Sequence, residues 1–143
     1  MPRLLVPLAL LVFTAACSHA PAPSSSPQVL LLGEVHDNAA GHAARAAQLR
    51  ERIEAGWRPA IAVEQFDTAQ QAALDAAMRD CADADCVVAK AAPAKSGWTW
   101  DYYKPVIALA IEYKLPLLAA NLSRGDASKI VKGGFAAALP AEL

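Results

Sequence analysis

The stretch that decides the expected fold is VLLLGEVHDN, residues 29–38. Val29 to Leu32 form a continuous aliphatic run, the pattern of a strand buried on both faces of a parallel sheet. Gly33 allows the backbone to turn sharply after that run, and Asp37 or Asn38 can cap a following helix. This order of strand, turn and helix predicts the first unit of an α/β domain.

The rest of the chain repeats the same alternation of apolar runs and amphipathic helices. Ala60 to Val63 and Leu117 to Ala120 predict two further strands. The first expected helix runs from about residue 38 to 55 and ends before Gly56. The second begins at a Thr68–Gln71 capping box and runs to about residue 79, and the third runs from about 104 to 114. The inner face of the third is expected to be Val106, Leu109, Ala110 and Tyr113, and a last short helix is expected to begin at Asp126 and end at Gly133 and Gly134. Residues 80 to 99 are predicted to be a loop.

This alternation predicts an α/β fold with a short parallel sheet and right-handed crossover helices. Three strands are few for such a sheet, and they leave two long edges open. In addition, Pro140 to Leu143 resemble the start of another helix. We therefore expect residues 28–143 to be a truncated domain, incomplete at its carboxyl end.

The amino-terminal residues are predicted to be a targeting segment. The apolar run of residues 4–13 is about half of the ~20 residues needed to cross a bilayer, so residues 1–16 are interpreted as a signal peptide. Small residues precede Cys17, which favours a lipobox, an acylated (palmitate-bearing) cysteine and a Pro/Ser-rich stalk over residues 17–27. The alternative is an ordinary cleaved signal. We expect a lipoprotein anchored in the bacterial envelope, facing the periplasm, with the outer membrane favoured over the inner.

Charge and cysteine content limit the other possibilities. The formal net charge of −1 argues against a nucleic-acid partner. Cys81 and Cys86 are not spaced like a zinc motif, but an envelope location permits a disulfide between them. The alternative is that Cys81 simply extends the apolar stripe of a helix.

Polar side chains follow each of the three predicted strands. Glu34 and His36 follow the first, Glu64 follows the second, and the segment from Asn121 to Arg124 follows the third. Because the carboxyl ends of parallel strands meet at one edge of a sheet, we expect these groups to line one crevice. His42 lies on the apolar stripe of the first helix and is expected to point inward.

Four motifs in order resemble the ChaN family of haem-binding lipoproteins, which are linked to iron uptake. They are Leu31 to Asn38, Glu64 to Phe66, Gly97–Trp98 with Tyr103 to Pro105, and Ala119 to Arg124. The superfamily also holds Tiki-type metalloproteases and erythromycin-esterase-like enzymes. The chain departs from the family pattern after Asn38, where only His42 stands in place of a paired His-His, and a later histidine-containing motif is missing. The resemblance therefore implies the amino-terminal part of such a protein.

The resemblance implies haem held between two monomers, with a tyrosine oxygen on the iron and His and Lys groups near the propionates. A phenolate favours ferric iron, and cationic donors offset propionate charge. Tyr102 and Tyr103 are the candidate ligands, with Tyr103 preferred. The candidate haem-binding residues are His36, His42, Lys104 and Arg124 near the propionates, with Glu34 and Asn121 beside them. A haem-dependent homodimer is the expected assembly.

Two other functions remain open. Glu34 and His36 are two residues apart and face the same way in an extended chain, so with Glu64 they could bind a divalent metal for hydrolysis. Alternatively, the polar strand ends of a structural lipoprotein only hydrogen-bond loops. We favour a binding protein, with the metal-dependent hydrolase as the alternative.

Overall fold

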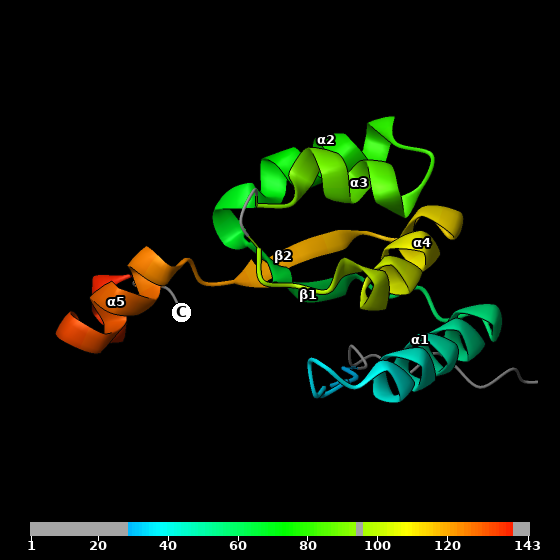
Figure 1. Cartoon of the computed structure of the whole chain (residues 1–143), viewed down its shortest axis with the longest axis horizontal. Helices are drawn as coiled ribbons and strands as arrows, with labels where there is room; N and C mark the ends of the chain where they lie inside the picture. Colours follow the sequence, from blue (N-terminus) through cyan, green and yellow to red (C-terminus); the bar gives the residue numbers. More distant parts are fainter. Residues whose placement is uncertain (1–28, 94–95, 139–143) are drawn as a thin grey trace, which may run out of the picture. The chain divides into compact units, whose positions relative to one another are not determined.

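The computed structural model describes residues 29–93 and 96–138 (Figure 1). The expectations for the signal peptide, for Cys17 and the stalk, and for Pro140 to Leu143 lie outside these residues. The chain divides into two units, residues 1–31 and 32–143. In the first unit, Val29 and Leu31 are largely exposed.

The prediction of a strand at Val29 to Leu32 is wrong, because these residues have no strand assignment. An aliphatic run has strand propensity, but a strand forms only where a neighbouring strand pairs with it. Within the described residues the sheet therefore has two strands and not three.

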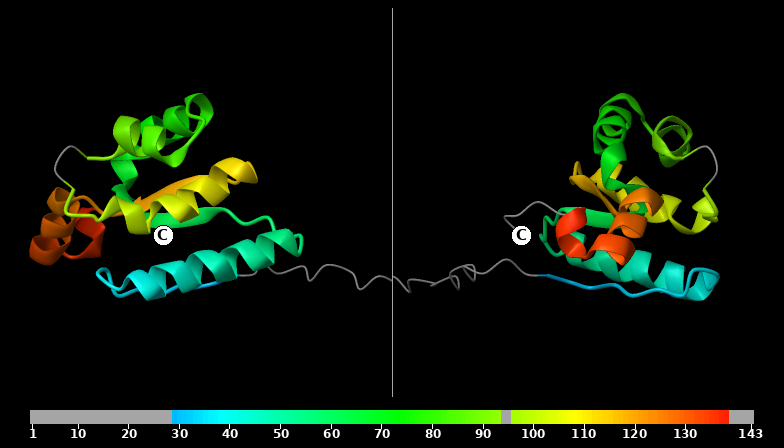
Figure 2. Two further views of the ribbon diagram at one scale, coloured as in Figure 1. Left: turned by 45° about the vertical axis from the view of Figure 1, so that its right-hand side comes forward. Right: turned by 90° about the vertical axis from the view of Figure 1, so that its left-hand side faces the viewer.

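The second unit has an α/β fold. Its elements are α1 (Ala39–Glu54), β1 (Ile61–Asp67), α2 (Gln71–Asp80), α3 (Ala84–Ala91), α4 (Lys104–Glu112), β2 (Leu117–Asn121) and α5 (Arg124–Gly133). Three short 3₁₀ helices join them: η1 (Thr68–Gln70), η2 (Trp100–Tyr102) and η3 (Phe135–Ala137). The two views of Figure 2 show α2 and α3 together on one side of the strands, and α1 on the other.

The two strands are parallel, as predicted. Ile61 pairs with Leu117 and Val63 with Ala119, and the register then shifts before Asp67 meets Asn121. Along β2, Leu117 and Ala119 are buried whereas Leu118 is exposed. Successive residues of β2 thus alternate between buried and exposed, whereas in β1 the adjacent Gln65 and Phe66 are both buried.

Side-chain caps explain where the helices begin and end. Asn38 caps α1 by accepting a hydrogen bond of 2.9 Å from the Gly41 N–H, as the sequence suggested. Gly56 follows that helix with a φ of +102°, a conformation that glycine adopts without strain. Ser123 caps α5 by accepting a hydrogen bond from the backbone of Asp126.

Three helix predictions need correction. The capping box before α2 is formed by Asp67 and Gln70, one residue earlier than the expected Thr68–Gln71 pair. Asp126 lies inside the first turn of α5 and is not its cap. The predicted loop of residues 80–99 contains α3, because Asp83 supplies a cap to the Cys86 N–H at 2.8 Å.

The core lies between the strands and the helices of the second unit. Its buried members come from every long element of that unit except α5, and the largest are Phe66, Ile53, Leu74, Ile107, Leu109 and Val87. The inner face of α4 includes Ile107 with the expected Leu109 and Ala110, whereas Val106 and Tyr113 are only partly buried. A disulfide joins Cys81, at the end of α2, to Cys86 of α3. Of the helices in the described ranges, none combines the length and apolarity that crossing a bilayer requires.

Candidate functional site

The site is organised around the segment Leu32 to Asp37, which has no regular secondary structure beyond a turn. The turn is closed by the Asn38 N–H, which donates to the Val35 carbonyl at 3.0 Å. Two side chains of α1 hold the segment from one side. Arg45 donates to the Leu32 carbonyl at 3.4 Å, and His42 contacts the His36 carbonyl at 3.1 Å.

Glu34 is the centre of the polar network. One of its carboxylate oxygens accepts hydrogen bonds from the Tyr103 hydroxyl at 2.8 Å and from Nδ1 of His36 at 2.7 Å. The other oxygen forms an ion pair with Arg45. Burial by itself would raise the pKa of Glu34, but the hydrogen bonds from Tyr103, Arg45 and His36 outweigh it and lower that pKa. Glu34 is therefore held as a carboxylate.

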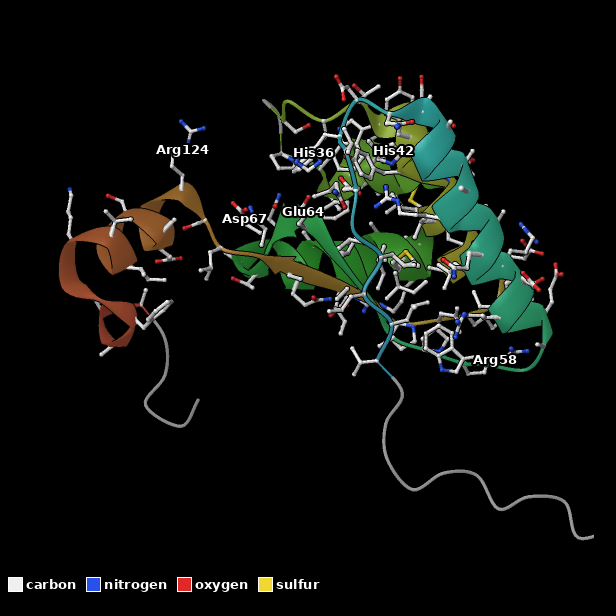
Figure 3. The ribbon with its side chains drawn as sticks, turned by 90° about the horizontal axis from the view of Figure 1, so that it is seen from below. His36, His42, Arg58, Glu64, Asp67 and Arg124 are labelled. Carbon is white, nitrogen blue, oxygen red and sulfur yellow. A yellow bond between two sulfur atoms is a disulfide. The ribbon has the colours of Figure 1, made fainter. Side chains whose placement is uncertain are left out.

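The contacts of His36 determine where its lone pair lies. A carboxylate only accepts hydrogen bonds, so Nδ1 of His36 carries the proton that it shares with Glu34. In the singly protonated ring, Nε2 then has a free lone pair. That side chain is 60% exposed, and its Nε2 lies 3.8 Å from a carboxylate oxygen of Glu64. Figure 3 shows His36 and Glu64 as neighbours.

His42 is buried, as predicted, and it faces the site segment from behind. Its Nδ1 contacts the Arg45 guanidinium, which can only donate, so Nδ1 accepts. Nε2 then carries the proton and donates to the His36 carbonyl. The ring also stacks on Tyr102 and meets Tyr103 edge-on, each with a centroid distance of 4.9 Å. All its polar atoms are thus used inside the protein.

A cleft of about 410 Å³ opens beside this network. It is lined by residues of the site segment and of the stretch before α4, namely His36, Asp37, Gly97, Trp98, Thr99 and Tyr103. The indole of Trp98 packs edge-on against both His36 and Tyr103, with centroid distances of 4.9 and 5.4 Å. The cleft therefore combines an aromatic wall with one exposed imidazole.

Tyr103 contributes its ring to the cleft, while its hydroxyl is used internally. The side chain is buried, and its O–H donates to Glu34. Burial raises the pKa of Tyr103, and the hydrogen bond to Glu34 and its negative charge raise it further. The phenolate that we expected as an iron ligand is thus disfavoured at neutral pH.

The expected cationic partners lie elsewhere or are already paired. Lys104 forms ion pairs with Asp85 at 2.6 Å and Asp101 at 2.8 Å, and its pKa is raised by these hydrogen bonds, most by the one to Asp101. Arg124 begins α5 and lies apart from His36, His42 and Glu64 in Figure 3. Asn121 donates to Asp67 at 2.7 Å. The structure therefore brings together Glu34, His36 and Glu64 with Tyr103, but not Arg124.

Arg45 is a residue of the site that the sequence analysis did not identify. Its side chain is only 19% exposed and contacts Glu34. The available signal was its position three residues after His42, because residues i and i+3 of a helix lie on neighbouring positions of one face. A histidine expected to point inward thus indicated an inward arginine as well.

Glu34, His36 and Glu64 also form a group that could hold a metal ion. Each offers one ligand atom, and the three atoms all lie within 4.8 Å of one another. Both oxygens of Glu34 already accept hydrogen bonds, one of them from the cationic Arg45. A metal at this position would compete with hydrogen-bond donors that Glu34 already has.

Comparison with known proteins identifies a family. The model of a family described as "Haem-binding uptake, Tiki superfamily, ChaN" matches residues 22–143. No curated protein and no solved structure matches the chain.

Proposed function

This chain belongs to the ChaN family of the Tiki superfamily, a haem-binding uptake family, and we propose from that premise that it binds haem in the cleft beside His36. The observation that carries the proposal is the pairing of His36 with Glu34. A histidine that ligates a metal almost always donates its other ring N–H to a carboxylate or carbonyl, which orients the ring and raises its basicity. His36 has this partner at 2.7 Å.

We assign the iron to Nε2 of His36 in preference to the tyrosine suggested by the sequence. Imidazole is a common axial ligand of haem iron. Nε2 of His36 is exposed beside the cleft, whereas the Tyr103 hydroxyl is buried and donates to Glu34. Tyr103 and Trp98 then supply aromatic surface against which the porphyrin packs.

The acidic side chains constrain how the propionates lie. Asp37 lines the cleft, and Glu64 lies beside His36. Like charges repel, so we propose that the two propionates point away from this rim. Lys104 reaches them only by exchanging its aspartate partners. A second copy of the chain is a further source of cations, which keeps the haem-dependent dimer as a proposal.

A haemin titration followed through the Soret band tests the proposal. We expect a saturable spectrum for the wild type and the loss of that spectrum in His36→Gln, which removes the proposed iron ligand. Tyr103→Phe should keep the wild-type spectrum, with Tyr113→Phe, at the residue that follows α4, as the matched control. A free-haemin spectrum at every ratio in the wild type would sink the proposal. Sedimentation at increasing haem ratios tests the dimer, and a monomer throughout would contradict it.

The envelope location is part of the same proposal. Cys17 follows small residues in a lipobox-like arrangement, and acyl chains on it would anchor the protein facing the periplasm. Metabolic labelling with palmitate, followed by membrane fractionation, should label the wild type but not Cys17→Ser. Equal labelling of both proteins would exclude this cysteine as the anchor.

The grouping of Glu34, His36 and Glu64 favours one second candidate, a metal-dependent hydrolase. In that case a divalent ion bound by these residues would activate water, with a carboxylate as the base. Equilibrium dialysis with Zn²⁺ or Mn²⁺ and a panel of ester and peptide substrates provide the test. Binding and turnover that are both lost in Glu64→Gln would support this candidate; no ion uptake in the wild type would end it.

A further inference from the structure

We propose that Arg45 is a positioning residue of the cleft: it fixes the Glu34 carboxylate and the surrounding segment so that His36 presents Nε2 to the ligand. This inference rests on the proposed haem site. It concerns a residue of α1 that does not line the cleft and does not touch the proposed ligand.

Arg45 determines which contacts each oxygen of the Glu34 carboxylate makes. The guanidinium pairs with one oxygen, which leaves the other to accept from both His36 and Tyr103. Without Arg45, the Tyr103 hydroxyl would be the one remaining contact that orients the carboxylate toward His36. The direction in which Glu34 holds the His36 ring would then be less tightly fixed.

Side chains of α1 contact the segment at Leu32, Glu34 and His36. Arg45 bonds the Leu32 carbonyl and the Glu34 side chain, and through His42 it supports the contact to the His36 carbonyl. The three contacts fix the backbone at Leu32 and at His36 and the side chain of Glu34 between them, and so restrict the direction of the His36 side chain.

Arginine is the residue type whose side chain can supply all of these hydrogen bonds at once. One Nη atom of Arg45 serves both Leu32 and Glu34, and the other bonds Nδ1 of His42. A planar guanidinium carries five donors in a fixed fork, whereas the lysine ammonium is a single point charge. The contact to Arg45 also makes Nδ1 of His42 an acceptor, so that Nε2 must carry the proton donated to the His36 carbonyl.

The experiment compares Arg45→Met and Arg45→Lys with two controls on the same helix. Leu49→Ala removes a buried side chain without touching the network, and Arg52→Met removes an exposed arginine. The first readout uses the apo protein labelled with ¹⁵N-histidine at about pH 8, where free imidazole is neutral. Long-range ¹⁵N–¹H spectra report which ring nitrogen of His36 carries its proton. The second readout is haemin affinity from the Soret titration.

We expect wild-type His36 to be protonated on Nδ1, and this preference to be lost in Arg45→Met together with an affinity loss of about 10- to 100-fold. Arg45→Lys should fall between the two, because one ammonium can keep Glu34 but not the whole set of bonds. Leu49→Ala and Arg52→Met should keep the wild-type tautomer and affinity. A Lys variant as weak as the Met variant would show that the whole guanidinium set of bonds is required. Wild-type tautomer and affinity in both variants would overturn the inference.

The remaining outcomes separate this inference from the proposed function. If the wild type does not bind haemin while the tautomer still depends on Arg45, the positioning role stands and the haem site falls. If haemin binds tightly and both readouts are unchanged in Arg45→Met, the positioning role falls and the haem site stands. If Arg45→Met does not fold, an unchanged tautomer and affinity in Arg45→Lys would overturn the positioning role.

Discussion

The site segment Leu32 to Asp37 and helix α5 differ in the contacts that fix their positions. The segment has no helix or strand, yet Arg45 and His42 of α1 and Tyr103 beside α4 all bond to it. Helix α5 has regular backbone hydrogen bonds but no buried residue, and Val131 on it is 87% exposed. In this protein, contacts with side chains of other elements therefore position a segment, and regular secondary structure alone does not.

The same difference appears in the ion pairs of the two regions. Glu34 and Arg45 are both largely shielded from solvent, with side chains 13% and 19% exposed. Lys129 and Asp126 of α5 pair one turn apart on an exposed face. Losing one partner of a shielded pair leaves an uncompensated charge, whereas exposed pairs contribute little because water and salt screen them. The four changes below test this contrast in order of decreasing expected effect.

Removing the carboxylate at the centre of the network should have the largest effect. We expect Glu34→Ala to lower the free energy of unfolding by about 3 kcal/mol, since Arg45 is left shielded and unpaired. Urea unfolding followed by tryptophan fluorescence measures this change. Glu112→Ala, which breaks an exposed pair with Arg50, is the control and should cost much less.

Acid provides a second measurement on the same pair of proteins. The folded-state pKa of Glu34 lies below its ordinary value of 4.5, so its stabilising contribution is complete above that pH. The contribution is lost as the pH falls through the folded-state pKa. The difference in stability between wild type and Glu34→Ala should therefore shrink in acid. A difference that is constant from neutral to acid pH would contradict this account of Glu34.

Breaking the disulfide tests a segment that is held covalently. Cys81 and Cys86 are five residues apart, and a loop of this size gives a stabilisation of about 2 kcal/mol in the chain-entropy model. We expect the double alanine variant to lose about that amount in urea unfolding. Adding a reductant should cost the wild type a similar amount and leave the variant unchanged. A wild type indifferent to reductant would show that helix packing alone holds α2 and α3 together.

Removing one hydroxyl should have a smaller effect. Tyr103→Phe keeps the aromatic contacts but loses the hydrogen bond to a carboxylate, for which we expect about 1.5 kcal/mol. Because the pKa of Tyr103 is raised in the folded protein, this contribution is complete below the ordinary tyrosine pKa of about 10 and declines at higher pH. Tyr113→Phe is the matched control, since its hydroxyl lies 3.4 Å from the exposed Glu54. Equal losses in the two variants would contradict the special role of Tyr103.

Trimming α5 should have the smallest effect. We expect Val131→Ala to change the free energy of unfolding by no more than about 0.5 kcal/mol, as is usual for exposed sites. Leu49→Ala on α1, which removes a buried side chain, should cost about 2 kcal/mol or more under the same conditions. A comparable loss in both variants would show that the face of α5 is covered in solution.

Much of the fold followed from local patterns in the sequence. The cap at Asn38, the run before Asn121 and the glycines after α1 and α5 are signals carried by neighbouring residues. The missed features needed other information. The run at Val29 to Leu32 has the composition of a strand without a paired neighbour, and α3 begins at a single aspartate cap inside a stretch that resembles a loop.

For the site, the sequence by itself determined which chemical groups are available. These groups are two carboxylates and an imidazole that follow two apolar stretches, and aromatic rings from a later segment. Only the tertiary structure decided what each group does. It turned Arg45 onto Glu34, used the Tyr103 proton inside the network and left Nε2 of His36 beside the cleft. The physical reason is that periodicity and capping act over a few residues, whereas protonation and hydrogen-bond direction depend on partners up to 69 positions away along the chain.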